Sequence, residues 1–518
     1  MAKSVIMSAW TRHLGAPDRG LCATDLTTLT MLPSHSVLAA SLMLCVLRMV
    51  IAASTGLTDD EAYYRLWGLG PALSYLDHPP MAGWMIWLGQ QIAGDSALGV
   101  RLAAVLAPLL GTLLTWRTAG VLFGPVVAER AAWFGLAIPL LAVGGVVMTP
   151  DTPSVLFWGL TSWATAELWR SGRPNWWLLV GLFAGLGLMS KYTNLFAGAG
   201  IGLWLFGSGQ LGRQLRSWQL WAGGAIALAC TTPVVAWNWA HHWASFGKQF
   251  GRVASGHELT LRYFGEFAGS LVGLLSPAIA VLAGIGIWRA ATAAYRDRRS
   301  AELLLLAAVL PLGLYLSVHS LHDRIPPNWP APIYPALGLL AALGVGQLPA
   351  SWGRHGVRLR RLALPLGLVT IAAIYGHVVH PLLHLPGEQD PTAQMHGWAD
   401  FGQRIEARRQ AVGATWIATS SYATTGQLAF RAPPAIPVLQ LDERLRYINL
   451  PVPDARLLAS PGLYVELDRR EDPARLRQKF RSVLALGTIA RESDGLVIAT
   501  YSLYKIADPV GQVLDPVD

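Results

Sequence analysis

The sequence has 518 residues, of which 53% are hydrophobic and 14% are charged, and its mean hydropathy is +0.39. This composition is too apolar for a soluble protein of this length and is typical of a polytopic membrane protein. The formal net charge of +9 does not indicate a nucleic-acid partner, because the arginines lie in short loops between apolar segments, where the positive-inside rule explains them.

The first residues, 1–35, are mixed in polarity and lack the order of a cleaved signal peptide, so we expect a cytoplasmic lead. Met31 stands immediately before the first long apolar run and is an alternative start to Met1. The three cysteines of the chain have no metal-ligand spacing and do not indicate a disulfide framework.

From residue 36 to 384, apolar segments recur at a length that crosses a bilayer as a helix, and we expect about eleven such helices in a transmembrane domain. Their expected positions are 36–55, 97–116, 131–149, 153–169, 175–190, 193–208, 217–237, 266–288, 302–320, 330–348 and 362–383. Arginines between alternate pairs of these segments mark loops that we expect to be cytoplasmic. They are Arg117, Arg130, Arg170, Arg173, Arg213, Arg216, Arg289, Arg296, Arg298, Arg299, Arg354, Arg358, Arg360 and Arg361.

The other loops then face outward, and they hold the unusual polar clusters of the chain. The first of them, residues 58–96, has aromatic and apolar residues at helical spacing without room for a full span, so we expect helices that lie in the membrane interface. The others are "MTPDTP" (148–153), "SKYTN" (190–194), "WNWAHHWASFGKQF" (237–250) and "LHDRIPPNWP" (321–330). Arginine placement and polar-cluster placement therefore predict the same topology, with the N-terminus inside.

After residue 385 the composition becomes that of a water-soluble domain. Residues 395–411 have helical periodicity, and "YATTGQLAFR" and "EDPARLRQKFRS" also favour helix. The segments "TWIATSS", "PVLQL", "GLYVEL", "SVLALGTIA" and "GLVIATYSLYKI" are typical of short strands. We therefore predict a small α/β domain over 385–518. Because the N-terminus is expected inside and the number of spans is odd, this domain should lie on the outer side of the membrane. Its sequence contains no nucleophile elbow, zinc spacing or phosphate loop, so no residue assigns it a role.

Several charged residues fall on the predicted outer face. The acids Asp60, Glu61 and Asp151 could act as bases toward a hydroxyl, whereas cations could bind a lipid phosphate. The cations are Lys191 and Arg324 in the loops and Arg101 near the outer end of the second span. Taken singly, each has a plain structural reading: the acids suit a helix N-terminus or a loop, and a lysine at the end of a span often extends toward the interface. We expect Asp60, Asp151 and Lys191 to converge around a cavity open to lipid.

This combination resembles the multi-spanning GT-C glycosyltransferases, in particular the family of the lipid A aminoarabinose transferase and the dolichyl-phosphate-mannose protein mannosyltransferases. The resemblance covers residues 38–384, and the motifs that carry it, in order, are "TDDEAYY", "YLDHPPMAGW", "RLAAVLAPLLG", "MTPDTPSVLFW", "GLFAGLGLMSKYT", "PVVAWN" and "HWASF". It implies that Asp60 is the catalytic base with Glu61 beside it, that Asp151 is the second acidic position, and that Lys191 is the family's lysine after the glycine-rich span. Asp59 is an additional acid whose role the resemblance leaves open.

The stretch "YLDHPP" departs from the family pattern of tyrosine, acid, lysine and prolines, because His78 replaces the lysine that meets the lipid phosphate. Asp77 could still hold a divalent metal, with His257, His241 or His242 as partners. A tryptophan-rich interfacial loop is the plainer reading of those histidines, so the cofactor stays unassigned.

The expected function is transfer of a sugar from a polyprenyl-phosphate donor to a hydroxyl of a glycolipid, glycan or protein on the outer face of the plasma (inner) membrane. Lys191, Arg101, Arg324 and His78 are the candidate phosphate ligands, and inversion at the anomeric carbon is expected. The alternative is a lipid or lipid-linked-sugar flippase. Transporters usually carry ionisable residues near mid-membrane and often have repeated halves, whereas the spans of this sequence carry most of their charge at the ends. A third reading, a membrane anchor for the exterior domain, leaves the acidic loops unexplained.

Overall fold

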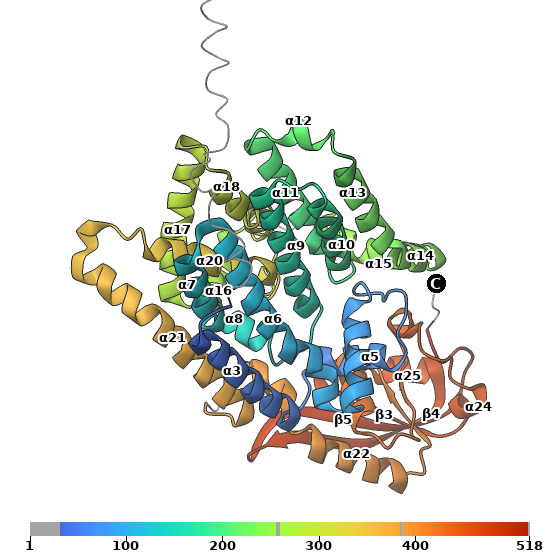
Figure 1. The fold of residues 1–518 in the computed structure, drawn as a ribbon. Coiled ribbons are helices and arrows are strands. Elements are labelled where there is room, and N and C mark those ends of the chain that lie inside the picture. Colours follow the sequence, from blue (N-terminus) through green and yellow to red (C-terminus); the bar gives the residue numbers. More distant parts are fainter. Residues whose placement is uncertain (1–31, 255–258, 384–385, 388, 516–518) are drawn as a thin grey trace, which may run out of the picture.

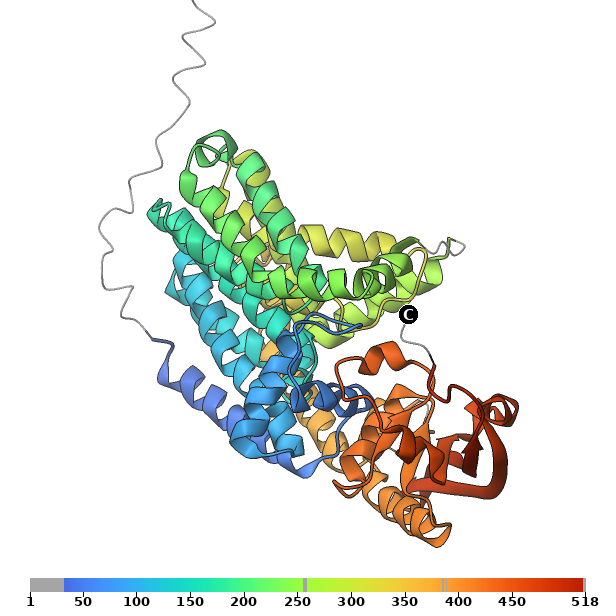
Figure 2. The ribbon, with the colours of Figure 1, turned by 90° about the vertical axis from the view of Figure 1, so that its right-hand side faces the viewer.

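The structure is a computed structural model, and it describes residues 32–254, 259–383, 386–387 and 389–515. A bundle of helices is followed by a smaller domain built on a β-sheet, which lies beside one end of the bundle (Figures 1 and 2). The two candidate starts, Met1 and Met31, and the candidate metal ligand His257 lie outside the described residues.

The bundle is built from helices of very different lengths. In chain order they are α3 (His35–Ser54), α4 (Asp59–Leu69), α5 (Met81–Ala93), α6 (Ala97–Phe123), α7 (Pro125–Leu136), α8 (Pro139–Val143), α9 (Asp151–Ser171), α10 (Trp176–Leu188), α11 (Leu195–Gly207), α12 (Leu211–Gln214), α13 (Trp218–Cys230), α14 (Thr232–Ala240), α15 (Ala244–Ala254), α16 (Leu261–Leu275), α17 (Pro277–Arg296), α18 (Ser300–Ala307), α19 (Leu310–His319), α20 (Tyr334–Val345) and α21 (Gly353–Val379).

Five helical segments of the described chain are long and apolar enough to cross a membrane, or six if α13 and α14, bent by 41°, form one span. They are α3, α6, α17, the combined segment Ser300–His319 and the segment Ala350–Val379 that contains α21. The chain is therefore a multi-pass membrane protein. Each expected span overlaps a helix or a broken pair of helices, but the expected count of about eleven stays a prediction, since several of these helices are short.

The expected span at 266–288 is wrong in its boundaries. The helix breaks at Ser276, whose φ of 72° ends α16, and α17 begins at Pro277. Proline at a first helical position needs no hydrogen-bond partner for its nitrogen, so it starts a new helix there. The segment that can span the membrane is therefore Pro277–Arg296.

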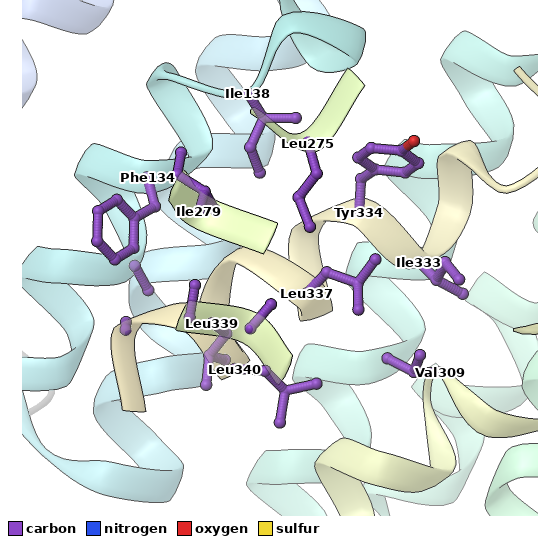
Figure 3. Close-up of a cluster of buried hydrophobic side chains, with 14 of the residues drawn as sticks. Phe134, Ile138, Leu275, Ile279, Val309, Ile333, Tyr334, Leu337, Leu339 and Leu340 are labelled. Carbon is purple, nitrogen blue, oxygen red and sulfur yellow. The ribbon is translucent and has the colours of Figure 1, made fainter. Parts of the chain in front are cut away.

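The largest buried cluster joins α7, α17 and α20 in the middle of the bundle, as Figure 3 shows for Phe134, Ile279 and Leu340. Glycine permits the close approach of these helices, because a Cβ on Gly286 would lie 1.9 Å from the carbonyl oxygen of Leu340. The glycine-rich helix α10 also packs closely: a Cβ on Gly181 would lie 2.0 Å from the Gly223 carbonyl oxygen of α13.

The two ends of the bundle differ in their charged residues. At one end, Glu167 near the end of α9 pairs with Arg117 of α6 and with Arg170, both at 2.8 Å. At the other end lie the outward-predicted loops, which are described below. Two of the arginines predicted to lie in cytoplasmic loops, Arg117 and Arg170, therefore lie together at the end of the bundle away from the acidic loops.

The C-terminal domain has a five-stranded mixed sheet in the order β2-β1-β3-β5-β4. Its strands are β1 (Trp416–Thr419), β2 (Val438–Gln440), β3 (Gly462–Leu467), β4 (Phe480–Ser493) and β5 (Leu496–Pro509), and its helices are α22 (Trp398–Ala411), α23 (Tyr422–Arg431), α24 (Ala455–Ala459) and α25 (Pro473–Lys479). The pairs β1–β2 and β1–β3 are parallel, and β3–β5 and β4–β5 are antiparallel. Every strand predicted in this region is present, which confirms the predicted fold class.

Candidate active site

Helix α4 presents the first acidic cluster, and its start is fixed by the local sequence. The Thr58 side chain accepts a hydrogen bond from the Glu61 N–H, and the Glu61 carboxylate accepts from the Thr58 N–H, which makes a capping box. Asp59, Asp60 and Glu61 occupy the first turn, where negative charge suits the helix dipole. The three acids nevertheless face different surroundings.

Glu61 points into the protein and forms an ion pair with Arg101 of α6, at 2.6 Å, with both side chains fully buried. The Arg101 guanidinium also donates to the backbone oxygens of Ala52, Thr55 and Gly56. The Met148 N–H donates to Glu61 Oε1 at 2.8 Å, the same oxygen that accepts from Arg101 Nε. The pair therefore ties α4 to α6 and to the chain entering α9.

These contacts correct two sequence assignments. Arg101 was expected to bind a donor phosphate, but its donors are taken by Glu61 and backbone oxygens in a region without solvent access. Glu61 was expected to act beside Asp60 in catalysis, but its carboxylate is enclosed in the same network. Both residues hold the site in place and cannot contact a substrate in this arrangement.

Asp60 is exposed, in contrast to Glu61 one residue along the helix. Its carboxylate accepts a hydrogen bond from the Tyr422 hydroxyl of the C-terminal domain at 3.1 Å. Packing of protein around the group raises the pKa of Asp60 by desolvation, and the neighbouring carboxylates raise it further, while the Tyr422 hydrogen bond opposes the rise. Desolvation likewise raises the pKa of Asp59, which accepts from the Gln427 side chain at 3.1 Å.

Asp77 follows α4 and lies among cations. Its carboxylate pairs with Lys248 of α15 at 2.6 Å and with Arg446 of the C-terminal domain, and it accepts from the Tyr63 hydroxyl at 2.9 Å. Desolvation would raise the pKa of Asp77, but the attraction of Arg446 and Lys248 outweighs it and lowers the pKa. Asp77 is therefore held as a carboxylate between two positive charges.

Asp151 and Lys191 meet as predicted. The Lys191 ammonium donates to one oxygen of Asp151 at 2.6 Å, and the Asn328 side chain donates to the other oxygen at 2.6 Å. The exposed fractions of the Lys191 and Asp151 side chains are 10% and 11%. Three loops that are far apart in the sequence therefore meet at one end of the bundle.

The clusters around Asp60, Asp77 and Asp151 share one region. The Tyr64 hydroxyl on α4 interacts electrostatically with all three carboxylates, and these charges add to desolvation in raising the pKa of Tyr64. The Met81 N–H donates to the Met189 carbonyl at 3.0 Å, which joins the loop of Asp77 to the loop of Lys191. Asp60, Asp151 and Lys191 therefore lie in one region around Tyr64, and the cavity open to lipid that should join them stays a prediction.

Other predicted residues lie less directly at this site. Arg324 is 75% exposed and pairs with Glu266 of α16 at 2.9 Å, on the loop that also carries Asn328. His78 lies beside Asp77, with its ring near those of Tyr64 and Trp67. We therefore keep both as peripheral candidates for phosphate contact.

The histidines of the tryptophan-rich loop do not join Asp77 in the described residues. His241 stacks on Trp237 and contacts its carbonyl oxygen, and His242 adopts a positive φ of 53° in the turn. Within the described ranges no group of three or more His, Cys, Asp or Glu side chains could hold a metal ion. Because Asp77 is paired with Lys248 and Arg446, its surroundings do not fit a divalent metal.

An apolar cavity lies within the bundle below the Asp151 cluster, with about 710 Å³ of empty space, part of it open to the surroundings. Its lining comes from α6, α9, α11, α18 and the segment entering α20, and includes Trp158, Ala197 and Pro332. Trp158 is seven residues beyond Asp151 on the same helix, which is about two turns, or roughly 10 Å. Thr118 and Thr165 also line the cavity, next to the Arg117–Glu167 pair, so it extends from about two helical turns below Asp151 toward the opposite end of the bundle and is apolar enough for a hydrocarbon chain.

Comparisons with known proteins fit this geometry. A family model described as dolichyl-phosphate-mannose-protein mannosyltransferase matches residues 77–237. ArnT from Cupriavidus metallidurans, solved with bound undecaprenyl phosphate, superposes with a TM-score of 0.64 at 17% identity, over 93% of this chain and 98% of that chain. The chain has the GT-C fold. The predicted resemblance to GT-C enzymes is thereby confirmed.

Two relatives that are similar in sequence are sugar transferases by name. Lipid A galacturonosyltransferase RgtD of Rhizobium johnstonii is 24% identical over 382 residues, which cover 70% of this chain and 75% of the relative. The undecaprenyl phosphate-alpha-4-amino-4-deoxy-L-arabinose arabinosyl transferase of Pseudomonas aeruginosa is 29% identical over 326 residues, which cover 58% of this chain and 56% of the relative. These names support the predicted enzyme class, a membrane glycosyltransferase.

Sequence reasoning on the GT-C motifs missed four residues that the fold brings to the site. Asn328 and Lys248 stand in loops that the sequence marked as polar, and Lys248 is the lone cation in "HHWASFGKQF". Tyr422 and Arg446 belong to the C-terminal domain, more than 360 residues along the chain from their partners, and carry no motif that would identify them.

Proposed function

We propose that this chain transfers a sugar from a polyprenyl-phosphate donor to a hydroxyl of a glycolipid acceptor. The observation that carries the proposal is that an exposed carboxylate, Asp60, and the Asp151–Lys191 pair lie in one region around Tyr64, in a GT-C fold whose bundle holds an apolar cavity. The relatives named above act on lipid A or use an undecaprenyl-phosphate sugar, which favours a glycolipid over a protein as acceptor.

Asp60 serves as the base in this proposal. It is exposed and its pKa is raised, so it is a better proton acceptor near neutral pH than an ordinary aspartate. The carboxylate takes the proton of the acceptor hydroxyl as the hydroxyl oxygen attacks the anomeric carbon. The bond between that carbon and the phosphate oxygen breaks, and the electron pair leaves with the polyprenyl phosphate. Attack opposite the leaving group inverts the configuration of the sugar.

The leaving phosphate needs positive charge, and the site offers two lysines. Lys191 uses one of its three N–H donors on Asp151, and Lys248 is 23% exposed while paired with Asp77. Lys248 reaches the residue next to His78, where the family pattern has the lysine that this sequence lacks. Lys248 therefore supplies the positive charge that His78 does not supply at the lysine position of the family pattern.

The polyprenyl chain of the donor would lie in the apolar cavity below Asp151. Gly159 lines that cavity, and a Cβ there would lie 3.7 Å from Leu114, so a larger side chain would fill the space. Gly159→Leu should weaken binding of undecaprenyl phosphate, measured with the purified protein, whereas Gly198→Leu on exposed α11 surface should not. Equal binding by both variants would remove the cavity from the proposal.

We further propose that the site faces the outside of the inner membrane, with the N-terminus inside and the C-terminal domain outside. The arginine-rich loops at the opposite end of the bundle support this orientation. Reporter fusions after residues 254 and 515 should both report an exterior location, and a cytoplasmic signal from the second would reverse the orientation.

Reconstituted vesicles test the function against the flippase alternative. The purified protein is supplied with an undecaprenyl-phosphate sugar and lipid A, and mass spectrometry looks for a new glycosidic bond. A glycosylated lipid A supports the transferase. Movement of labelled lipid between leaflets without a new bond would support the flippase instead.

A further inference from the structure

We propose that the C-terminal domain is part of the active site, with Tyr422 of α23 as a positioning residue that holds Asp60 in place and favours its ionised form. This inference rests on the proposed role of Asp60 as base. It assigns a residue-level role to a domain for which the sequence offers none.

One face of α23 lies directly on α4. Gly426 allows this contact, because a Cβ at that position would lie 2.7 Å from both the Ala62 carbonyl carbon and the Tyr63 nitrogen. Backbone atoms cannot move aside as a flexible side chain can, so a larger residue at this point would push the two helices apart. The close approach is therefore a built feature of the interface.

The same face of α23 contacts the turn that begins α4. The fully buried Gln427 side chain donates to the Leu57 carbonyl at 2.9 Å and to Asp59 at 3.1 Å. Further along α23, the Ala429 carbonyl accepts from Arg65 of α4 at 3.2 Å. Residues about one helical turn apart on α23 thus meet α4 over its length, which fixes Tyr422 relative to Asp60.

The Tyr422 ring is itself held from two sides. It packs edge-on against Tyr63, with ring centroids 5.4 Å apart, and the Arg446 guanidinium lies 4.9 Å from its centroid. Arg446 also pairs with Asp77, so one arginine of the C-terminal domain joins both carboxylate clusters. The Tyr422 hydroxyl is therefore presented to Asp60 by packing rather than by a free rotamer.

The other charged and titratable groups around Asp60 come from each neighbouring element: Asp59, Glu61 and Tyr64 from α4, Asp77 from the following loop, and Tyr422 and Arg446 from the C-terminal domain. The neighbouring carboxylates disfavour a further negative charge on Asp60. The Tyr422 hydroxyl donates a hydrogen bond to the ionised form and opposes them. Without that hydrogen bond, Asp60 should remain protonated, and inactive as a base, up to a higher pH.

The test measures the ionisation of Asp60 without a sugar substrate. The full-length protein in detergent is treated with a carbodiimide, which reacts with protonated carboxyl groups, at a series of pH values. Tandem mass spectrometry then quantifies the modification at Asp60. Tyr422→Phe should move the labelling midpoint to higher pH by about one unit, the change expected for loss of one hydrogen bond to a charged group.

Tyr504→Phe is the matched control, since the Tyr504 hydroxyl donates to Glu471 within the same domain and away from Asp60. Its midpoint should equal that of the wild type. Gly426→Ala forces α23 away from α4 and should shift the midpoint in the same direction as Tyr422→Phe. Unchanged midpoints in both Tyr422→Phe and Gly426→Ala would overturn the inference.

An activity readout separates this inference from the proposed function. In the vesicle assay, Tyr422→Phe should lose about tenfold in transfer rate on the acidic side of the pH profile and approach the wild-type rate at high pH. An equal loss at every pH would indicate a structural role only and overturn the inference. A wild-type protein that makes no glycosidic bond, with the labelling shift intact, would overturn the proposed function alone.

Discussion

Asp60 and Asp77 lie in the same region of the molecule but in opposite electrostatic surroundings. Asp60 is exposed, has one hydroxyl partner and has acidic neighbours, so its pKa is raised. Asp77 is enclosed by Lys248 and Arg446, so its pKa is lowered. A place in a family motif is therefore not enough to assign a role to a carboxylate. The surroundings make Asp60 suitable as a proton acceptor and hold Asp77 as a fixed negative charge.

A third carboxylate, Glu61, sharpens this contrast because it stands next to Asp60 on the same helical turn. Glu61→Gln would leave the fully buried Arg101 without its counter-charge and should cost about 3–5 kcal/mol of folding free energy. Thermal unfolding in detergent measures the effect. Asp400→Asn, which breaks an exposed pair with Arg404, is the control and should cost under about 0.5 kcal/mol.

Substitutions of Asp77 and Asp60 should also differ in their effect on the free energy of unfolding. Asp77→Asn would leave Lys248 and Arg446 facing each other without the anion between them and should cost about 3 kcal/mol. Asp60→Asn should cost little, because the fold disfavours the charge that it removes. Equal destabilisation by the two substitutions, measured by thermal unfolding, would break the comparison.

The lysine that pairs with Asp77 should affect catalysis more than stability. Lys248→Met removes a positive charge proposed to face the leaving phosphate and should lower the transfer rate about 10- to 100-fold. Lys248→Arg keeps the charge and should retain most of the activity. If both variants transfer sugar at the wild-type rate in the vesicle assay, the phosphate role of Lys248 is wrong.

The smallest expected effect is a difference in pH dependence. Because the pKa of Asp77 is lowered, the stability from its ion pairs should persist at neutral pH and be lost only as the pH falls below 3.8, the usual value for aspartate. Asp60, with a raised pKa, should instead cost stability as the pH rises above 3.8 and the group ionises. Unfolding temperatures of the wild type and Asp60→Asn should therefore diverge with rising pH, in favour of the variant.

Much of the fold could be predicted from the sequence because the signals are local. Apolar length located the helices, and alternation located the strands of the C-terminal domain, whose predicted positions match β1 to β5. The break at Ser276 was missed because a serine at positive φ has no distinctive sequence signal, even though the following Pro277 allows a new helix to begin.

The site was predictable only where a motif carries a functional residue. Asp151 and Lys191 meet as their motifs predict, whereas Arg101 could not be assigned correctly, because a sequence does not show which side of a helix end faces the interior. Tyr422 and Arg446 could not be found at all, since their contacts depend on how a separate domain lies on α4. Their roles follow from three-dimensional packing rather than from residue type.

The most direct measurement is the rate of sugar transfer by purified Asp60→Asn alongside its binding of undecaprenyl phosphate. The account predicts that transfer falls about 10²- to 10⁴-fold, the usual contribution of a general base, while lipid binding stays at the wild-type level. Transfer by Asp60→Asn at the wild-type rate would contradict it.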